Sequence, residues 1–147
     1  MDRKKAVAEL NQSLYALVQE FERLQLVIGR EHGLGVTEMR GLGCIAEGER
    51  VTPKVLAAEL QLTTGAVTAL ADRLVDAGLV ARQPHPDDRR SLLLATTAQG
   101  SETISRIASA YEAVVRDGTI GLGVGRLTEA AEVLDGLVAH TRSTFAR

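Results

Sequence analysis

The chain has 147 residues, 45% of them apolar and 24% charged, and this composition predicts a single globular domain over residues 1–147, with no apolar run long enough to cross a membrane. Its net charge of −2 excludes a strongly basic protein, so any surface for nucleic acid has to be assembled locally, and its 3% of aromatic residues argues against base-stacking sites for single strands. The single cysteine excludes an intrachain disulfide, and the basic N-terminus is not followed by the apolar segment of a secretory signal, so we expect a cytoplasmic protein.

The first thirty residues have apolar positions spaced alternately by three and four. These positions are Val7, Leu10, Leu14, Leu17, Phe21, Leu24 and Ile28. They predict a long helix with one apolar stripe, ending near Gly29. The stripe could be the buried face of a monomer, but a chain of this size has little left to cover it. We therefore expect a homodimer.

A shorter helix is predicted from an N-cap at Thr37 through Ala46, ending at Gly48. Gly41 and Gly43 lie inside it, and each costs roughly 1 kcal/mol relative to alanine. Close packing of the backbone against a neighbouring element would explain both.

Residues 52–78 have the spacing of a helix–turn–helix. Thr52 and Pro53 form a start signal for the first helix, and Gln61–Thr63 is a tight turn. The second helix is capped by Thr63 and stops at Gly78, and its inward face is Val67, Leu70, Ala71 and Leu74. Thr64 and Thr68 face outward, where they can hydrogen-bond to base edges or touch a thymine methyl group. The alternative is that these threonines only cap the helix or contact solvent.

Two strand-like runs follow, "LVARQP" and "SLLLATT", around the charged tip "HPDDRR". A hairpin directly after a helix–turn–helix is a wing. Thr97 then caps a long helix, "DGTIGLGVG" interrupts it, and a last helix carries Leu127, Leu134 and Leu137. The predicted fold is mainly α with a small β-hairpin wing, a winged helix–turn–helix lobe at 37–97, and flanking dimerisation helices at 1–33 and 98–147.

The stretch "AVTALADRLVDAGLVAR", followed by "PDDRR" and "TTAQG", resembles the MarR family of transcriptional regulators, and the resemblance extends over about residues 8–145. It implies a sequence-specific regulator of double-stranded DNA. It further implies a dimeric repressor on a pseudo-palindromic operator, released by a small aromatic or anionic ligand. A winged-helix module that binds another protein and has little DNA affinity is the alternative, and an enzyme has no supporting residues.

The resemblance also assigns roles to individual positions. Asp88 and Arg90 occupy the family's D-x-R positions, in which the arginine enters the minor groove and the aspartate holds the wing tip. Thr63, Thr64 and Thr68 lie where the recognition helix meets the major groove, and Arg82 lies where relatives steady the helix or contact the backbone. One departure is Ala69, because many relatives have an arginine there that can read a guanine.

Local charge supports the same surface. Arg89 is expected to meet a phosphate, and Lys54 and Arg73 join it as phosphate contacts. A narrow A·T-rich minor groove favours an inserted arginine, and a carboxylate two residues earlier can orient the Arg90 guanidinium. The alternative is a solvated turn, since exposed ion pairs contribute only about 0–1 kcal/mol.

Other chemistry has less support. Cys44 lies on the second helix, away from the position used by peroxide-sensing relatives, so an inert buried thiol is expected. The histidines at 32, 85 and 140 lack metal-ligand spacing, and no metal, cofactor or catalytic site is predicted. Ligand-binding candidates by approximate position are Tyr15, His32, Met39 and Arg40.

Overall fold

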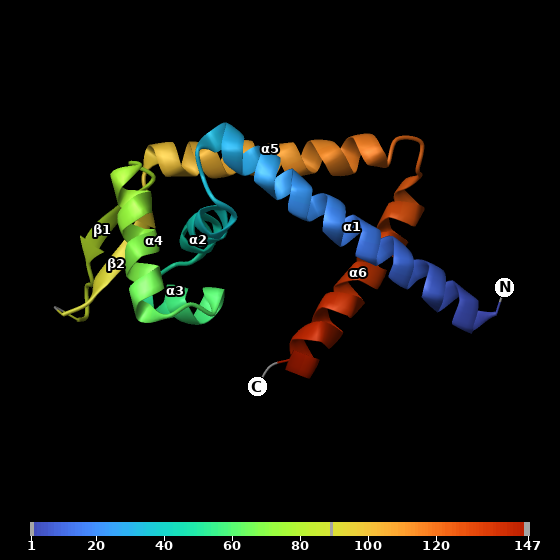
Figure 1. Ribbon diagram of the computed structural model, residues 1–147, viewed down its shortest axis with the longest axis horizontal. Coiled ribbons are helices and arrows are strands. Elements are labelled where there is room, and N and C mark those ends of the chain that lie inside the picture. Colours follow the sequence, from blue (N-terminus) through green and yellow to red (C-terminus); the bar gives the residue numbers. More distant parts are fainter. Residues whose placement is uncertain (1, 89, 146–147) are drawn as a thin grey trace. The chain divides into compact units, whose positions relative to one another are not determined.

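The computed structural model describes residues 2–88 and 90–145 of the chain (Figure 1). In chain order it contains α1 (Arg3–His32), α2 (Val36–Glu47), α3 (Pro53–Leu60), α4 (Thr64–Asp76), β1 (Val80–Pro84), β2 (Leu92–Thr96), α5 (Ala98–Gly118) and α6 (Val124–Phe145). Contacts divide the chain into two compact units, Met1–Ala108 and Ser109–Arg147.

The core of the first unit lies where α2, α3 and α4 pack together. The side chains most completely buried there are Leu42, Leu56, Val67, Leu70 and Leu74. Gly41 allows α2 to approach α4 closely, because a Cβ atom at this position would lie 3.0 Å from Leu70 Cδ2. No atom lies within 4 Å of a Cβ placed on Gly43, so the packing reason predicted for that glycine is wrong.

Threonine caps account for three helix starts. The hydroxyl oxygens of Thr52 and Thr63 accept hydrogen bonds from the amides of Val55 and Ala66, at 3.2 and 3.3 Å. Thr97 Oγ1 accepts from the Gly100 amide at 3.0 Å, at the start of α5. These three predictions are confirmed, because a side-chain acceptor next to an unsatisfied helical N–H can be read from local sequence.

The predicted start of α2 is wrong, whereas the end predicted for α1 lies within four residues of the observed one. Helix α2 is capped at Gly35 rather than Thr37, because the Glu38 carboxylate reaches back to the Gly35 amide at 2.6 Å. Helix α1 runs through Gly29 to His32 and ends at Gly33, whose φ of 67° closes the helix in the left-handed conformation.

Helices α3 and α4 are joined by a tight turn, followed by an antiparallel hairpin. Gln61 ends α3 with a φ of 54°, and Thr63 already caps α4. Strand β1 pairs with β2 in a register that places Val80 opposite Thr96 and Pro84 opposite Leu92. This is the predicted winged helix–turn–helix, and the hairpin lies beside α4 in Figure 1.

The hairpin is also attached to the segment before α3. The Leu94 amide donates to the Val51 carbonyl at 2.8 Å, which forms an isolated antiparallel bridge. Leu94 and Val51 are both buried, with 3% and 5% exposed surface. The wing is therefore held against the helix–turn–helix by backbone pairing and by apolar burial, an attachment that sequence periodicity does not reveal.

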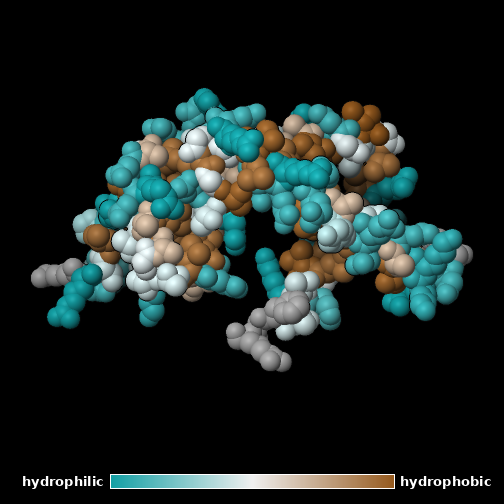
Figure 2. All heavy atoms as spheres, in the orientation of Figure 1, coloured by the Kyte–Doolittle hydropathy of each residue, from teal (hydrophilic) through white to brown (hydrophobic). Residues whose placement is uncertain are grey.

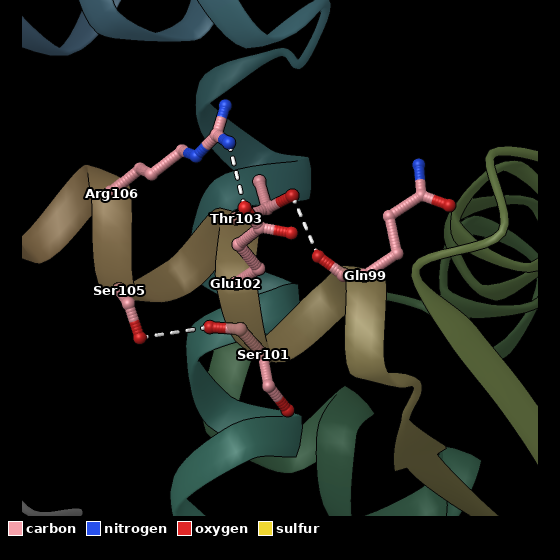
Figure 3. Close-up of polar contacts among 6 residues, drawn as sticks. All are labelled: Gln99, Ser101, Glu102, Thr103, Ser105 and Arg106. Carbon is pink, nitrogen blue, oxygen red and sulfur yellow. Dashed lines mark hydrogen bonds and ion pairs between the residues drawn. The ribbon is translucent and has the colours of Figure 1, made fainter.

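Polar side chains in the first half of α5 bond to one another and to the helix backbone, as Figure 3 shows. Thr103 donates to the Gln99 carbonyl, Ser105 donates to the Ser101 carbonyl, and Arg106 pairs with Glu102 at 2.6 Å. Ile107 lies on the inner side and is buried. This amphipathic division explains why the segment begins as a helix against the first unit.

The helices outside the lobe leave many apolar side chains exposed. Along the stripe of α1, Ile28 is buried, whereas Val7, Leu10 and Leu17 are 43–51% exposed. None of the described residues after Ser109 is buried. Brown hydrophobic side chains accordingly lie at the surface over the α5–α6 turn and over α6 in Figure 2. No helix among the described residues is both long enough and apolar enough for a membrane span.

Glu38 links α2 to α4. Besides capping α2, its carboxylate accepts from Arg73 Nε at 2.5 Å, and its side chain is only 18% exposed. The hydrogen bond from the Gly35 amide and the contact with Arg73 hold the pKa of Glu38 below its usual value of 4.5. The ionised carboxylate therefore stabilises the folded lobe above pH 4.5, and this contribution is lost as the pH falls through the lower folded-state pKa.

Replacing Glu38 with glutamine tests this link. E38Q should lower the free energy of unfolding by about 1–2 kcal/mol at pH 7, because two charge-assisted hydrogen bonds become neutral or are lost. The difference from the native chain should shrink at a second, more acidic pH, because the native carboxylate becomes protonated as the pH falls through its lowered pKa. Urea unfolding followed by circular dichroism at both pH values measures it.

Glu102 supplies the matched control, since its pair with Arg106 is about two-thirds exposed. E102Q should change the stability by less than about 0.5 kcal/mol at either pH. Equal losses in the two variants, or a loss in E38Q that does not depend on pH, would contradict the proposed role of Glu38.

Candidate nucleic-acid interface

A groove opens between the starts of α3 and α4 and the tip of the wing. We call it the wing groove. It has a volume of about 640 Å³ and is lined by Thr52, Pro53, Lys54, Ala57, Thr64, Arg90, Ser91 and Leu92. Three residues singled out from sequence, Lys54, Thr64 and Arg90, thus come together although 36 positions separate the first from the last.

The wing groove carries unpaired positive charge. Neither Lys54 nor the Arg90 guanidinium has an acidic partner among the described residues. Both are exposed. Cationic side chains without internal partners, beside a helix N-terminus that presents free amides, make a surface suited to phosphate oxygens.

Asp88 shapes the wing tip. Its carboxylate accepts hydrogen bonds from the Arg90 amide at 2.9 Å and from the Ser91 hydroxyl at 2.6 Å. These two bonds hold the pKa of Asp88 below its usual value. The sequence suggested that a carboxylate at this spacing orients the Arg90 guanidinium. The bond goes instead to the backbone amide, so Asp88 sets the course of the chain from which Arg90 projects. Arg89 lies outside the described residues.

The wing tip has a second attachment, which no sequence pattern predicts. Arg50, just before α3, contacts Asp87 with an Nη1–Oδ2 distance of 2.7 Å. Both side chains are more than 60% exposed, so the pair adds little stability. It does hold the tip toward α3, and it gives Asp87 a partner other than the neighbouring arginines. Thirty-seven positions separate the two residues, and no local pattern joins them.

The outward threonines of α4 differ in what their hydroxyl groups do. Thr63 caps the helix, and Thr64 lines the wing groove. One turn further on, Thr68 donates its hydroxyl hydrogen to the Thr64 carbonyl at 2.9 Å. Thr64 and Thr68 are both exposed, on the same side of the helix as Ala69.

Arg73 and Arg82 are both engaged within the lobe. Arg73 contacts Glu38 of α2, and Arg82 of β1 pairs with Asp72 of α4. Both pairs tie α4 to a neighbouring element. The structure thus places both arginines as supports of α4, which is one of the two roles expected for Arg82, whereas Arg73 was expected to contact phosphate.

The four ligand candidates do not share one cavity. Arg40 lines a groove of about 560 Å³ between α1 and α2, together with Val18, Phe21, Glu22, Gln25, Leu26 and Val36. Tyr15 is exposed, His32 is half-buried, and Met39 is buried with its Cε close to Gly29. None of these last three side chains lines the groove.

Cys44 is half-buried rather than fully buried. It lines a small cavity of about 240 Å³ with Glu47 and Glu59. Burial, and then the two carboxylates, raise the pKa of the Cys44 thiol, which disfavours the reactive thiolate. Within the described residues, no three His, Cys, Asp or Glu side chains are grouped to hold a metal ion.

Comparison with known sequences finds that the lobe is similar to one family. Residues 32–91 match the model of the MarR family. The chain is 40% identical over 62 residues to the uncharacterised HTH-type transcriptional regulator YcgE of Bacillus subtilis, and 28% identical over 95 residues to the multiple antibiotic resistance protein MarR of Salmonella typhimurium. These matches cover 42% and 65% of the chain, and they span 40% and 66% of the two relatives' own lengths.

Solved structures match over nearly the whole chain. A MarR family protein from Bacillus stearothermophilus aligns with a TM-score of 0.83 at 17% identity, covering 96% of this chain and 99% of that one. Streptococcus pneumoniae FabT, solved in complex with DNA, aligns with a TM-score of 0.74 at 23% identity, covering 96% and 99%. The family model matches the lobe, and over nearly the whole chain the fold is similar to that of the MarR family protein from Bacillus stearothermophilus.

Proposed function

We propose that this protein is a sequence-specific regulator of transcription that binds double-stranded DNA as a homodimer. The observation that carries the proposal is the wing groove, which joins Lys54, Thr64 and Arg90 next to the exposed side of α4. An α-helix fits the major groove of DNA, and an arginine on an adjacent wing can reach the minor groove. FabT, which shares the fold, was solved in complex with DNA, and this supports DNA as the partner.

Residues 1–33 and 98–147 are the regions that we assign to dimerisation. A single chain leaves Val7, Leu10 and Leu17 of α1 exposed, and it also leaves exposed Val133, Leu134, Leu137 and Val138 of α6. Exposed apolar side chains of this kind, on each of the two helices, mark an association site. A second copy is the occupant we propose, because a two-fold axis would present two identical lobes to the two half-sites of a pseudo-palindromic operator.

A ligand site is proposed in the groove between α1 and α2. Val18, Phe21, Leu26 and Val36 supply apolar walls, and Arg40 supplies a guanidinium without an acidic partner among the described residues. Apolar walls with one cation suit a small aromatic carboxylate. Such a ligand would release DNA by favouring a lobe position that does not fit the operator.

DNA binding is tested by fluorescence anisotropy with the promoter-side DNA next to the protein's own gene. If Lys54 and Arg90 of both protomers neutralise about four phosphates, affinity should fall about 100-fold between 50 and 200 mM salt. R90A should weaken binding at least tenfold, whereas R106A, which alters an exposed pair on α5, should not. Salt-independent binding, or an unchanged R90A, would favour the alternative of a protein-interaction module.

Dimerisation is tested by light scattering after size exclusion, where the native chain should have about twice its mass of 15.7 kDa. The double variant L134E/L137E should be monomeric at about 10 µM with unchanged helical content, because both side chains are exposed in the single chain. A139E, a change on another side of α6, is the matched control and should stay dimeric. A native protein that runs as a monomer would refute the proposal.

Ligand release is tested in the same anisotropy assay with sodium salicylate as the probe. Millimolar salicylate should lower the DNA affinity of the native chain, and R40A should be less sensitive to it. R23A is the control, because Arg23 is an exposed arginine of α1 that pairs with Glu20 at 2.8 Å. If R40A and R23A respond like the native chain, the groove is not the site of release.

A further inference from the structure

The outward side of α4 begins with small side chains. Over its first two turns the exposed residues Thr64, Gly65, Thr68 and Ala69, which we call the reading face, are all small. If the chain binds DNA as proposed above, these residues meet the floor of the major groove. We propose that the reading face recognises thymine methyl groups rather than guanine edges, and that Thr68 is the residue that sets this preference.

The hydroxyl of Thr68 is already occupied. Its one hydrogen is donated to the Thr64 carbonyl at 2.9 Å, one helical turn back. A threonine has a single O–H donor, so none remains for a base acceptor such as guanine O6 or N7. The oxygen can still accept a hydrogen bond from adenine N6 or cytosine N4, whereas the methyl group of Thr68 is the part of the exposed side chain suited to the methyl group of thymine.

The charged side chains at 72 and 73, further along α4, form ion pairs within the lobe. Bidentate recognition of guanine requires an arginine or lysine that reaches O6 and N7. Arg73 is held by Glu38, and Asp72 is held by Arg82. These ion pairs join α4 to α2 and to β1. Asp72 and Arg73 therefore hold the helix in place and are not directed toward bases.

The small residues around Thr68 let its methyl group reach the DNA. A Cβ placed on Gly65 would meet nothing within 4 Å, so the surface beside it is open. Ala69 adds a second methyl group to the same side. In the major groove, the C5-methyl of thymine is the apolar group that such a surface can contact. The half-site under α4 should therefore consist of A·T pairs, with thymines where Thr68 and Ala69 approach.

The first experiment selects duplexes with the native dimer from a random pool of 30-base-pair DNA, and it then replaces single thymines of the enriched duplex with deoxyuridine. Uracil differs from thymine only by the missing methyl group. Each replacement under α4 should weaken binding about fourfold, which corresponds to the ~0.8 kcal/mol gained by burying one methyl group. Enrichment of a fixed G·C pair under α4 would overturn the inference.

The second experiment compares two variants that divide the threonine side chain. T68V keeps the methyl group and the branched shape but lacks the hydroxyl, and it should bind within twofold of the native chain and still distinguish thymine from uracil. T68S keeps the hydroxyl but lacks the methyl group, and it should bind about fourfold more weakly and lose that distinction at one position. Circular dichroism checks that both variants fold.

The outcomes separate this inference from the function on which it rests. A protein that enriches no duplex overturns both. Tight, salt-dependent binding in which uracil replaces thymine without effect overturns the methyl preference alone. A loss of binding in T68V with full binding in T68S does the same, because it would show that the hydroxyl oxygen contacts the base.

Discussion

Burial of leucine side chains between α2, α3 and α4 is the interaction on which the rest of the lobe depends. Leu42, Leu56, Leu70 and Leu74 are almost completely removed from water, each contributing about 1.5–3 kcal/mol. This packing sets the angle of α4 against α3. The bridge from Val51 to Leu94 attaches the hairpin to the same core. The wing groove exists because these contacts bring three chain segments to one edge.

Charge in this protein is arranged locally rather than in bulk. The chain has a net charge of −2, yet the carboxylates of Glu38, Asp72 and Asp88 are used within the lobe, where they anchor α4 and the wing tip. Lys54 and Arg90 are left without acidic partners among the described residues. An acidic chain can thus present a cationic groove. Carboxylates within the lobe neutralise Arg73 and Arg82, and the cations that lack such partners are the ones that line the groove.

The lobe and the flanking helices present two different kinds of surface. Small residues on the reading face allow close approach, and the cations beside them supply attraction that does not depend on base sequence. The flanking helices, by contrast, expose apolar side chains that contribute nothing to such a contact and are suited to a second copy. The proposed function would then require two parts. The lobe is fully packed within the single chain, whereas the flanking helices need a second copy to cover their apolar side chains.

Periodicity and capping chemistry in the sequence were sufficient to predict every helix, the hairpin and the caps at Thr52, Thr63 and Thr97, because these depend on residues within about four positions of one another. The same local reasoning placed Lys54, Thr64 and Arg90 at the candidate site. It could not show that Glu38 holds Arg73, that Arg50 pairs with Asp87, or that Val51 bridges to Leu94. Those partners lie 35 to 43 positions apart, and only the folded core decides which side chains it brings within hydrogen-bonding distance and which it leaves to face a partner.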